Sequence, residues 1–232
     1  MALRLLLWLV IAGGLAAGFA WAPLVPVLGA TTHVLYLHVP AAFVAFIALG
    51  WSMLHSVLYL ARRDMRHDDH AAGAAELGIL FCVVATISGS LWAKAQWGSY
   101  WNWDPRETSI FFVLLIYAAY LALRGALEDG PRRARLSALY SVLAFVTAPF
   151  LFFVVPRLYA SLHPSPILPS REQGSMDPRI RVCFDAMLVG FTGLFFWMLN
   201  LRVRLGALAR RHAEVELEPP DSAVAAAGRG TR

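Results

Sequence analysis

The sequence has few charged residues, and this shortage restricts the class of protein. Only 15% of its 232 residues are Asp, Glu, Lys or Arg, whereas 59% are hydrophobic and the mean hydropathy is +0.58. A water-soluble core of this size cannot bury so much apolar side chain, which excludes a soluble globular domain. The same figures exclude a disordered chain. The sequence therefore predicts an integral membrane protein.

Cysteine is also scarce. Cys82 and Cys183 are the only two, and the sequence has no CxxC or CxxCH. A disulfide-stapled secreted fold, a thiol redox pair and covalently attached c-type haem are therefore unsupported, and both thiols are expected to be small buried side chains. Phosphate-cradling loops, zinc signatures and nucleophile elbows are missing from the sequence too, which leaves no motif of a conventional enzyme.

Charged residues are absent from Leu5 to Ala61, a stretch long enough for two membrane crossings at about 20 residues each. Pro23, Pro26 and Gly29 divide this stretch, because they interrupt helix propagation. Further apolar runs raise the number of crossings to six, so we expect an all-α bundle of six transmembrane helices. The expected spans are residues 3–21, 34–60, 74–93, 108–123, 136–155 and 182–201.

The basic residues predict the orientation of this bundle. Fourteen of the 20 Lys and Arg residues lie at the N-terminus, in even-numbered loops or after the last span, and six lie in odd-numbered loops. The positive-inside rule then places both termini in the cytoplasm and the odd loops outside, which in a bacterium is the periplasmic face of the inner membrane. Charges spaced between apolar runs also argue against a nucleic-acid partner.

The two ends of the chain carry further expectations. Residues 206–232 lack a periodic pattern, so we expect a disordered cytoplasmic tail after a membrane domain of residues 1–205. The first span has an alternative interpretation as a cleaved signal peptide, because Ala20-Trp21-Ala22 has the form of a cleavage site.

The second outside loop contains the segment Trp97-Gly98-Ser99-Tyr100-Trp101-Asn102-Trp103-Asp104-Pro105-Arg106-Glu107-Thr108. Asp104 is expected to cap the fourth span, with Pro105 at the first helical position and Glu107 completing a capping box. The aromatic side chains before it form either an interfacial belt or a platform for a flat apolar ligand, and the residues alone leave both open. In a helical segment, Trp97 and Trp101 would share a face.

Histidines occur in the other outside loops. His33 and His38 lie at the start of the second span and His163 lies in the third outside loop. Two neutral imidazoles can occupy the axial positions of haem iron, so His38 and His163 are candidate haem ligands beside the tryptophans. His55, inside the second span, is expected to be a packed polar residue that faces another helix. Arg181 and Asp185, one turn apart in the sixth span, are expected to pair, with a proton relay at Asp185 as the alternative.

The segment from Trp97 to Thr108 resembles the tryptophan-rich WWD signature of haem-handling proteins of cytochrome c biogenesis. With six spans, a His-Val-Pro-Ala-Ala stretch at His38 and a Leu-His-Pro at His163, the chain up to about Leu205 is similar to the CcmC, or haem exporter protein C, family. The resemblance implies non-covalent binding of haem b, with His38 and His163 as axial ligands. By position, it implies a haem platform of Trp97, Gly98, Tyr100, Trp101, Trp103 and Asp104.

The resemblance also implies a function and partners. Haem is presented at the periplasmic face and passed to a CcmE-type haem chaperone, with a small CcmD-type subunit and the CcmA/CcmB transporter as further partners. The chain would then be a haem-transfer component rather than a conventional enzyme.

A second member of the superfamily supplies an alternative. Tyr100-Trp101 replaces the adjacent tryptophans usual in CcmC, and the Asp104–Thr108 segment is closer to the CcsA-type cytochrome c synthases, which attach haem to apocytochrome thiols. The synthases usually have more spans and an additional pair of intramembrane histidines, whereas His55 stands alone in its span, so the short chain favours CcmC.

Overall fold

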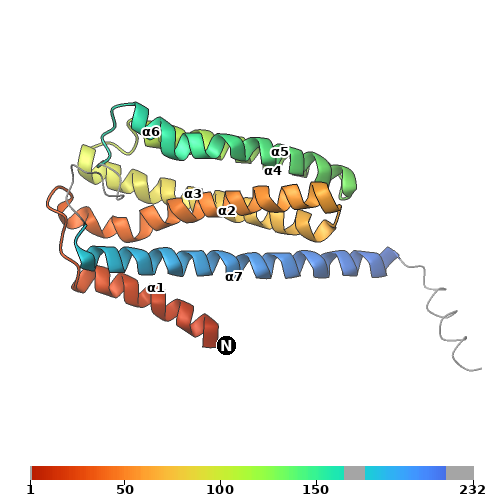
Figure 1. The fold of residues 1–232 in the computed structure, drawn as a ribbon, viewed down its shortest axis with the longest axis horizontal. Helices are drawn as coiled ribbons and strands as arrows, with labels where there is room; N and C mark the ends of the chain where they lie inside the picture. Colours follow the sequence, from red (N-terminus) through yellow and green to blue (C-terminus); the bar gives the residue numbers. More distant parts are fainter. Residues whose placement is uncertain (1, 165–175, 218–232) are drawn as a thin grey trace, which may run out of the picture.

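The chain forms a bundle of long helices (Figure 1). The computed structural model describes residues 2–164 and 176–217, with side chains as far as residue 209, and these residues contain no strand. In chain order the helices are α1 (Ala2–Ala20), the 3-10 helix η1 (Gly29–Val34), α2 (Leu35–Arg62), α3 (Met65–Trp97), α4 (Pro105–Gly125), α5 (Pro131–Pro149), the π-helix η2 (Phe150–Val154), α6 (Val155–Leu158) and α7 (Pro178–Leu217).

Six helical segments among the described residues are long and apolar enough to cross a membrane, which confirms the predicted all-α, six-span bundle. Several are longer than the sequence indicated. The third span begins at Met65 rather than near residue 74, because Asp64 accepts a hydrogen bond from the backbone N–H of Arg66 and caps the helix there. Polar residues thus extend α3 beyond its apolar part.

The fifth span is interrupted, where the sequence indicated one continuous helix over 136–155. α5 ends at Pro149, and the backbone N–H of Val155 then donates to the carbonyl of Phe150, the i to i+5 pattern of a π-helix. Pro149 and Pro156 lack the N–H that a regular helix needs, which accounts for an irregular turn between them.

The last helix also differs from the expected boundary. α7 continues to Leu217, so residues 206–217 are helical, although the sequence analysis placed a disordered tail from residue 206. No proline occurs in this stretch, so nothing in it interrupts a helix that continues from the last span. Residues 218–232, which carry the rest of that prediction, lie outside the described residues.

α2 and α3 form the centre of the bundle. α2 packs along most of α3 and also contacts α5 and α7, whereas α1 packs mainly on α7 at one edge (Figure 1). Small buried residues such as Ala41, Ala45 and Ala48 allow the two central helices to approach closely. At Gly78 an added Cβ would lie 2.6 Å from a methyl carbon of Leu49, so this close approach requires glycine.

The three loops that the sequence assigned to one face lie together at one end of the bundle (Figure 1). We call this the site end, where residues 21–34, 98–104 and 159–164 meet, and we call the opposite end the far end. Asp104 and Glu107 form the predicted capping box at the start of α4. Arg181 Nε donates to Asp185 at 2.8 Å, which confirms the predicted pair.

A buried ion pair joins α3 to α4 at the far end. The guanidinium of Arg124 donates to both carboxylate oxygens of Asp68, at 2.7 and 2.9 Å, and the Asp68 side chain is only 3% exposed. Removal of one partner leaves a buried charge unpaired, which typically costs about 3–5 kcal/mol of stability.

Asp68→Ala or Arg124→Ala should therefore lower the thermal unfolding midpoint of the detergent-purified chain. The decrease should be far larger than for Arg202→Ala, which breaks a more exposed ion pair with Glu76. Equal midpoints in the three variants would contradict this role.

Candidate functional site

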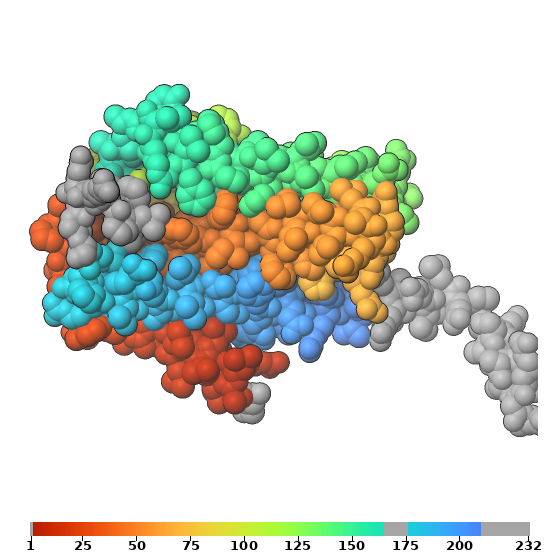
Figure 2. All heavy atoms as spheres, in the orientation of Figure 1, coloured from red at the N-terminus to blue at the C-terminus, as the bar shows by residue number. Residues whose placement is uncertain are grey.

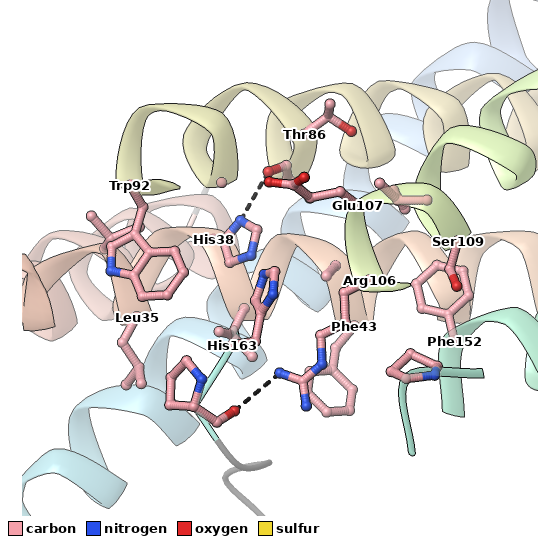
Figure 3. A pocket seen from close by; sticks show the side chains of 18 of the residues that line it. Leu35, His38, Phe43, Thr86, Trp92, Arg106, Glu107, Ser109, Phe152 and His163 are labelled. Carbon is pink, nitrogen blue, oxygen red and sulfur yellow. Dashed lines mark hydrogen bonds between the residues drawn. The ribbon is translucent and has the colours of Figure 1, made fainter. Parts of the chain in front are cut away.

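A cavity of about 440 Å³ opens at the site end, between α2, α3, α4, the η2–α6 segment and α7 (Figure 3). This volume is in the range of small-ligand sites, about 300–1,000 Å³. Three of the residues that the sequence predicted for the site line the cavity, namely His38, Trp101 and His163. The structure thus brings the two candidate ligands together although 125 positions separate them in the chain.

His38 lies in the first turns of α2 and is fixed by α3. Its Nδ1 lies 2.8 Å from the carbonyl oxygen of Ala85 and 3.2 Å from the Ser88 hydroxyl. Since a carbonyl only accepts, Nδ1 carries the proton and donates it to Ala85. This leaves Nε2 of the neutral ring with its lone pair, and Nε2 makes no hydrogen bond with the described residues.

His163 is fixed in the same way by a different group. Its Nδ1 donates to Asp104 Oδ1 at 2.8 Å, and this carboxylate also accepts from the Ser161 hydroxyl and from the backbone N–H groups of Arg106 and Leu162. Burial acts to raise the pKa of Asp104, but these donors outweigh it and the pKa is lowered, so the carboxyl is ionised. Burial lowers the pKa of His163 to about 4 despite the nearby carboxylate, so its ring is neutral at pH 7.

Both histidines therefore direct the same atom to the cavity. A neutral imidazole whose Nδ1–H is held by a carbonyl or carboxylate is the usual form of a metal-ligating histidine, with Nε2 as the donor atom. Among the described residues, no group of three or more His, Cys, Asp or Glu side chains could hold a bare metal ion. His38 and His163 instead suit a metal ion that is already coordinated by other ligands when it binds.

Two tryptophans pack against the ring of His163. The ring centroids of Trp92 and Trp97 lie 5.5 and 4.9 Å from that of His163. Trp97 does not line the cavity, so it supports His163 rather than the contents of the cavity. Trp92 does line it, and its Nε1 donates to Thr31 at 3.0 Å. Trp92 was not predicted from the sequence, because it lies inside an apolar span, five positions before the aromatic segment.

The remaining aromatic residues divide between the cavity and the surface. Trp101 lines the cavity, whereas Tyr100 and Trp103 are 56% and 67% exposed and do not. Gly98 ends α3 in the left-handed region at φ +77°, and residues 98–104 are not helical, so the helical face considered for Trp97 and Trp101 does not form. The segment therefore contributes residues both to the cavity and to the surface beside it.

Three arginines line the cavity, one each from α4, α6 and α7: Arg106, Arg157 and Arg181. Arg106 donates to the carbonyl of Pro164 at 3.1 Å and Arg157 donates to the carbonyl of Phe153. Carbonyl acceptors do not neutralise a guanidinium, so these two retain a full positive charge for an anionic group. From the sequence, Arg106 was predicted only to lie at the start of a helix, and its place in the cavity was not predicted.

The other singled-out residues lie apart from this cavity. His55 contacts histidines of α3, with its Nδ1 3.2 Å from that of His67 and its ring stacked on His70 at 4.6 Å. It is thus a packed polar residue that faces another helix, as predicted. Cys82 and Cys183 are buried free thiols, also as predicted.

The chain is similar in sequence to proteins of one family. A family model described as CcmC: Heme exporter protein C matches residues 1–218. The chain is 32% identical to Heme exporter protein C of Rhodobacter capsulatus over 225 residues, covering 92% of this chain and 90% of the relative. It is 30% identical to proteins of the same name from Bradyrhizobium diazoefficiens, covering 82% and 72%, and from Escherichia coli K12, covering 85% and 81%.

Proposed function

The chain belongs to the CcmC family of heme exporter proteins, and on this premise we propose that it binds haem as its cargo at the periplasmic end of the membrane and passes it to a periplasmic haem chaperone. Family membership assigns the chain to haem export for cytochrome c maturation. The observation that carries the finer proposal is the matched pair of imidazoles, His38 and His163, each with Nδ1–H held and Nε2 directed to one cavity.

The cavity suits haem in three respects. Two neutral imidazoles can supply both axial ligands while the porphyrin supplies the other four, which matches a site with two histidine donors. Trp92 and Trp101 offer aromatic surface to the macrocycle, and the charges of Arg106 and Arg157 suit its two propionates. Because ligation is non-covalent and no CxxCH occurs, haem b bound in this way can be released to an acceptor.

The orientation in the membrane follows from the charges. The site end carries the odd-numbered loops, which are poor in Lys and Arg, and the far end carries most of the basic residues. We therefore place the site end in the periplasm of a bacterial inner membrane and both termini in the cytoplasm. A CcmE-type chaperone can then reach the site from the periplasm, with a CcmD-type subunit and the CcmA/CcmB transporter as neighbours in the membrane.

Gly89 provides a test of the geometry around His38. An added Cβ would lie 2.7 Å from Cε1 of His38, whose Nδ1 is held by Ala85. Gly89→Ala should therefore displace the ring and lower the affinity for haem by about tenfold, which corresponds to about 1.4 kcal/mol. Gly13→Ala is the matched control, because nothing lies within 4 Å of its added Cβ. A haem titration in detergent measures both, and equal affinities would contradict the position assigned to His38.

The alternative function is a minimal CcsA-type synthase, favoured by the Asp104-Pro105-Arg106-Glu107-Thr108 sequence. Co-expression with an apocytochrome, without any other maturation protein, discriminates the two. We expect no covalent holocytochrome by haem staining of denaturing gels, because the chain offers haem only to a chaperone. Holocytochrome above the level of an empty-vector control would favour the synthase.

A further inference from the structure

The cavity reaches deep into the membrane region on one side. Along α2 its lining runs from Leu35 to Phe46, which at 1.5 Å per residue is about 17 Å, more than half of a hydrocarbon core of about 30 Å. Beyond His38, α2 and η2 contribute apolar side chains to the lining, among them Phe43, Phe46 and Phe152. From α7, Leu188 lines the cavity together with the paired side chains of Arg181 and Asp185.

This part of the cavity lies between two groups of helices. α7 packs on α1, α2 and α3, whereas η2 and α6 pack on α4 and α5, and no extensive contact joins α7 to η2 or α6 among the described residues. Figure 2 shows α2, in orange, at the surface between α5, in green, and α7, in blue. The part of the cavity beyond His38 is therefore lined by α2 with η2 on one side and α7 on the other. We call this the lateral groove.

The π-helix shapes one side of the lateral groove. In η2, Phe152 and Phe153 both line the cavity, and their ring centroids lie 5.4 and 4.9 Å from that of Phe46 on the floor. A π-turn widens a helix locally and commonly occurs at functional sites. The groove is thus lined by flat aromatic rings at a depth where water is absent and the surroundings are acyl chains.

We propose that haem enters the site sideways, from the membrane leaflet next to the site end, through the lateral groove between η2 and α7. This inference rests on the proposed function, since it concerns the route of the same cargo. The distribution of side chains in the cavity favours this route. A porphyrin that moves along α2 would keep its apolar edge against the phenylalanines, and its propionates would reach Arg106 and Arg157. The residues of the lateral groove line the same cavity as both histidines, so a porphyrin in the groove is already in the cavity that contains its ligands.

The test narrows the lateral groove without touching the ligands. Leu188→Trp enlarges a side chain that lines the groove, whereas Val189→Trp makes the same change at the next residue, which is 65% exposed and does not line it. Phe46→Trp enlarges a side chain of α2 that lines the groove two turns beyond His38, and it serves if Leu188→Trp fails to fold. Each full-length chain is expressed under haem limitation, reconstituted into phosphatidylglycerol and phosphatidylethanolamine vesicles, and mixed with vesicles loaded with haemin. Stopped-flow absorption in the Soret region records uptake.

We expect Leu188→Trp and Phe46→Trp to slow uptake by about tenfold, which is about 1.4 kcal/mol in the barrier, and to reach the same final spectrum as the wild type. Val189→Trp should be indistinguishable from the wild type. Unchanged uptake rates in the groove variants would overturn the proposal. They would indicate that haem enters the cavity from the aqueous side instead. If the groove variants lose the final spectrum of bound haem while Val189→Trp keeps it, the proposal is overturned too. The groove would then be part of the binding site rather than a route to it. A wild-type chain that shows no Soret band contradicts the proposed function instead.

Discussion

The variant with both His38→Ala and His163→Ala is expected to lose the low-spin haem spectrum completely. Loss of a residue that merely orients a metal ligand typically costs roughly 10–100-fold in affinity, and loss of both ligands removes far more. Each single variant should retain a weakly bound haem with one protein ligand and a high-spin spectrum. Absorption spectra of the detergent-purified proteins, recorded after haem is supplied during expression, measure this.

His55→Ala is the matched control for the double variant. It removes an imidazole from the same helix as His38, but one that contacts His67 and His70 at the far end rather than the cavity. The control should keep the wild-type spectrum. A double variant whose spectrum is unaltered would show that other residues are the ligands.

The second large effect is expected at Asp104. Its carboxylate accepts the Nδ1–H of His163 and also caps α4, so Asp104→Ala leaves His163 unoriented and removes a cap typically worth about 1 kcal/mol. We expect a roughly 10–100-fold loss in haem affinity, the cost of losing a group that orients a ligand. Asp104→Asn should retain the cap and the hydrogen bond from His163, because both go to Oδ1 and an amide oxygen accepts them. It loses only the bond from the backbone N–H of Leu162, which needs the second carboxylate oxygen.

The asparagine variant separates the charge of Asp104 from its geometry. Without the negative charge the imidazole of His163 becomes a weaker donor, so the bound haem should be easier to reduce and its potential more positive. A redox titration measures this shift, and Asp177→Asn serves as a control at an exposed acid near the start of α7. If Asp104→Ala binds haem as tightly as the wild type, the hydrogen bond to His163 has no role in the site.

Local and compositional features of the fold were predictable from the sequence. Long apolar runs predicted the six spans, and the residue order Asp104-Pro105-Arg106-Glu107 predicted the capping box, because both depend on residues close together in the chain. The grouping of His38, the aromatic segment and His163 at one end followed from the alternating direction of successive spans. Such features need no knowledge of how the helices pack.

Contacts between distant helices were not predictable in this way. The bond from His38 to the carbonyl of Ala85 joins residues 47 positions apart, and the space at Gly89 depends on how closely α2 approaches α3. Trp92 was hidden within an apolar span for the same reason. The π-helix after Pro149 and the exposure of Trp103 depend on tertiary packing, which residue pattern alone does not specify.

The absorption spectrum of the purified wild-type chain, before and after reduction, tests the central claim most directly. The proposed site predicts a Soret band and, on reduction, the sharp visible bands of low-spin haem with two imidazole ligands. Absence of a Soret band after haem is supplied during expression, or a purely high-spin spectrum, would contradict the binding of haem between His38 and His163.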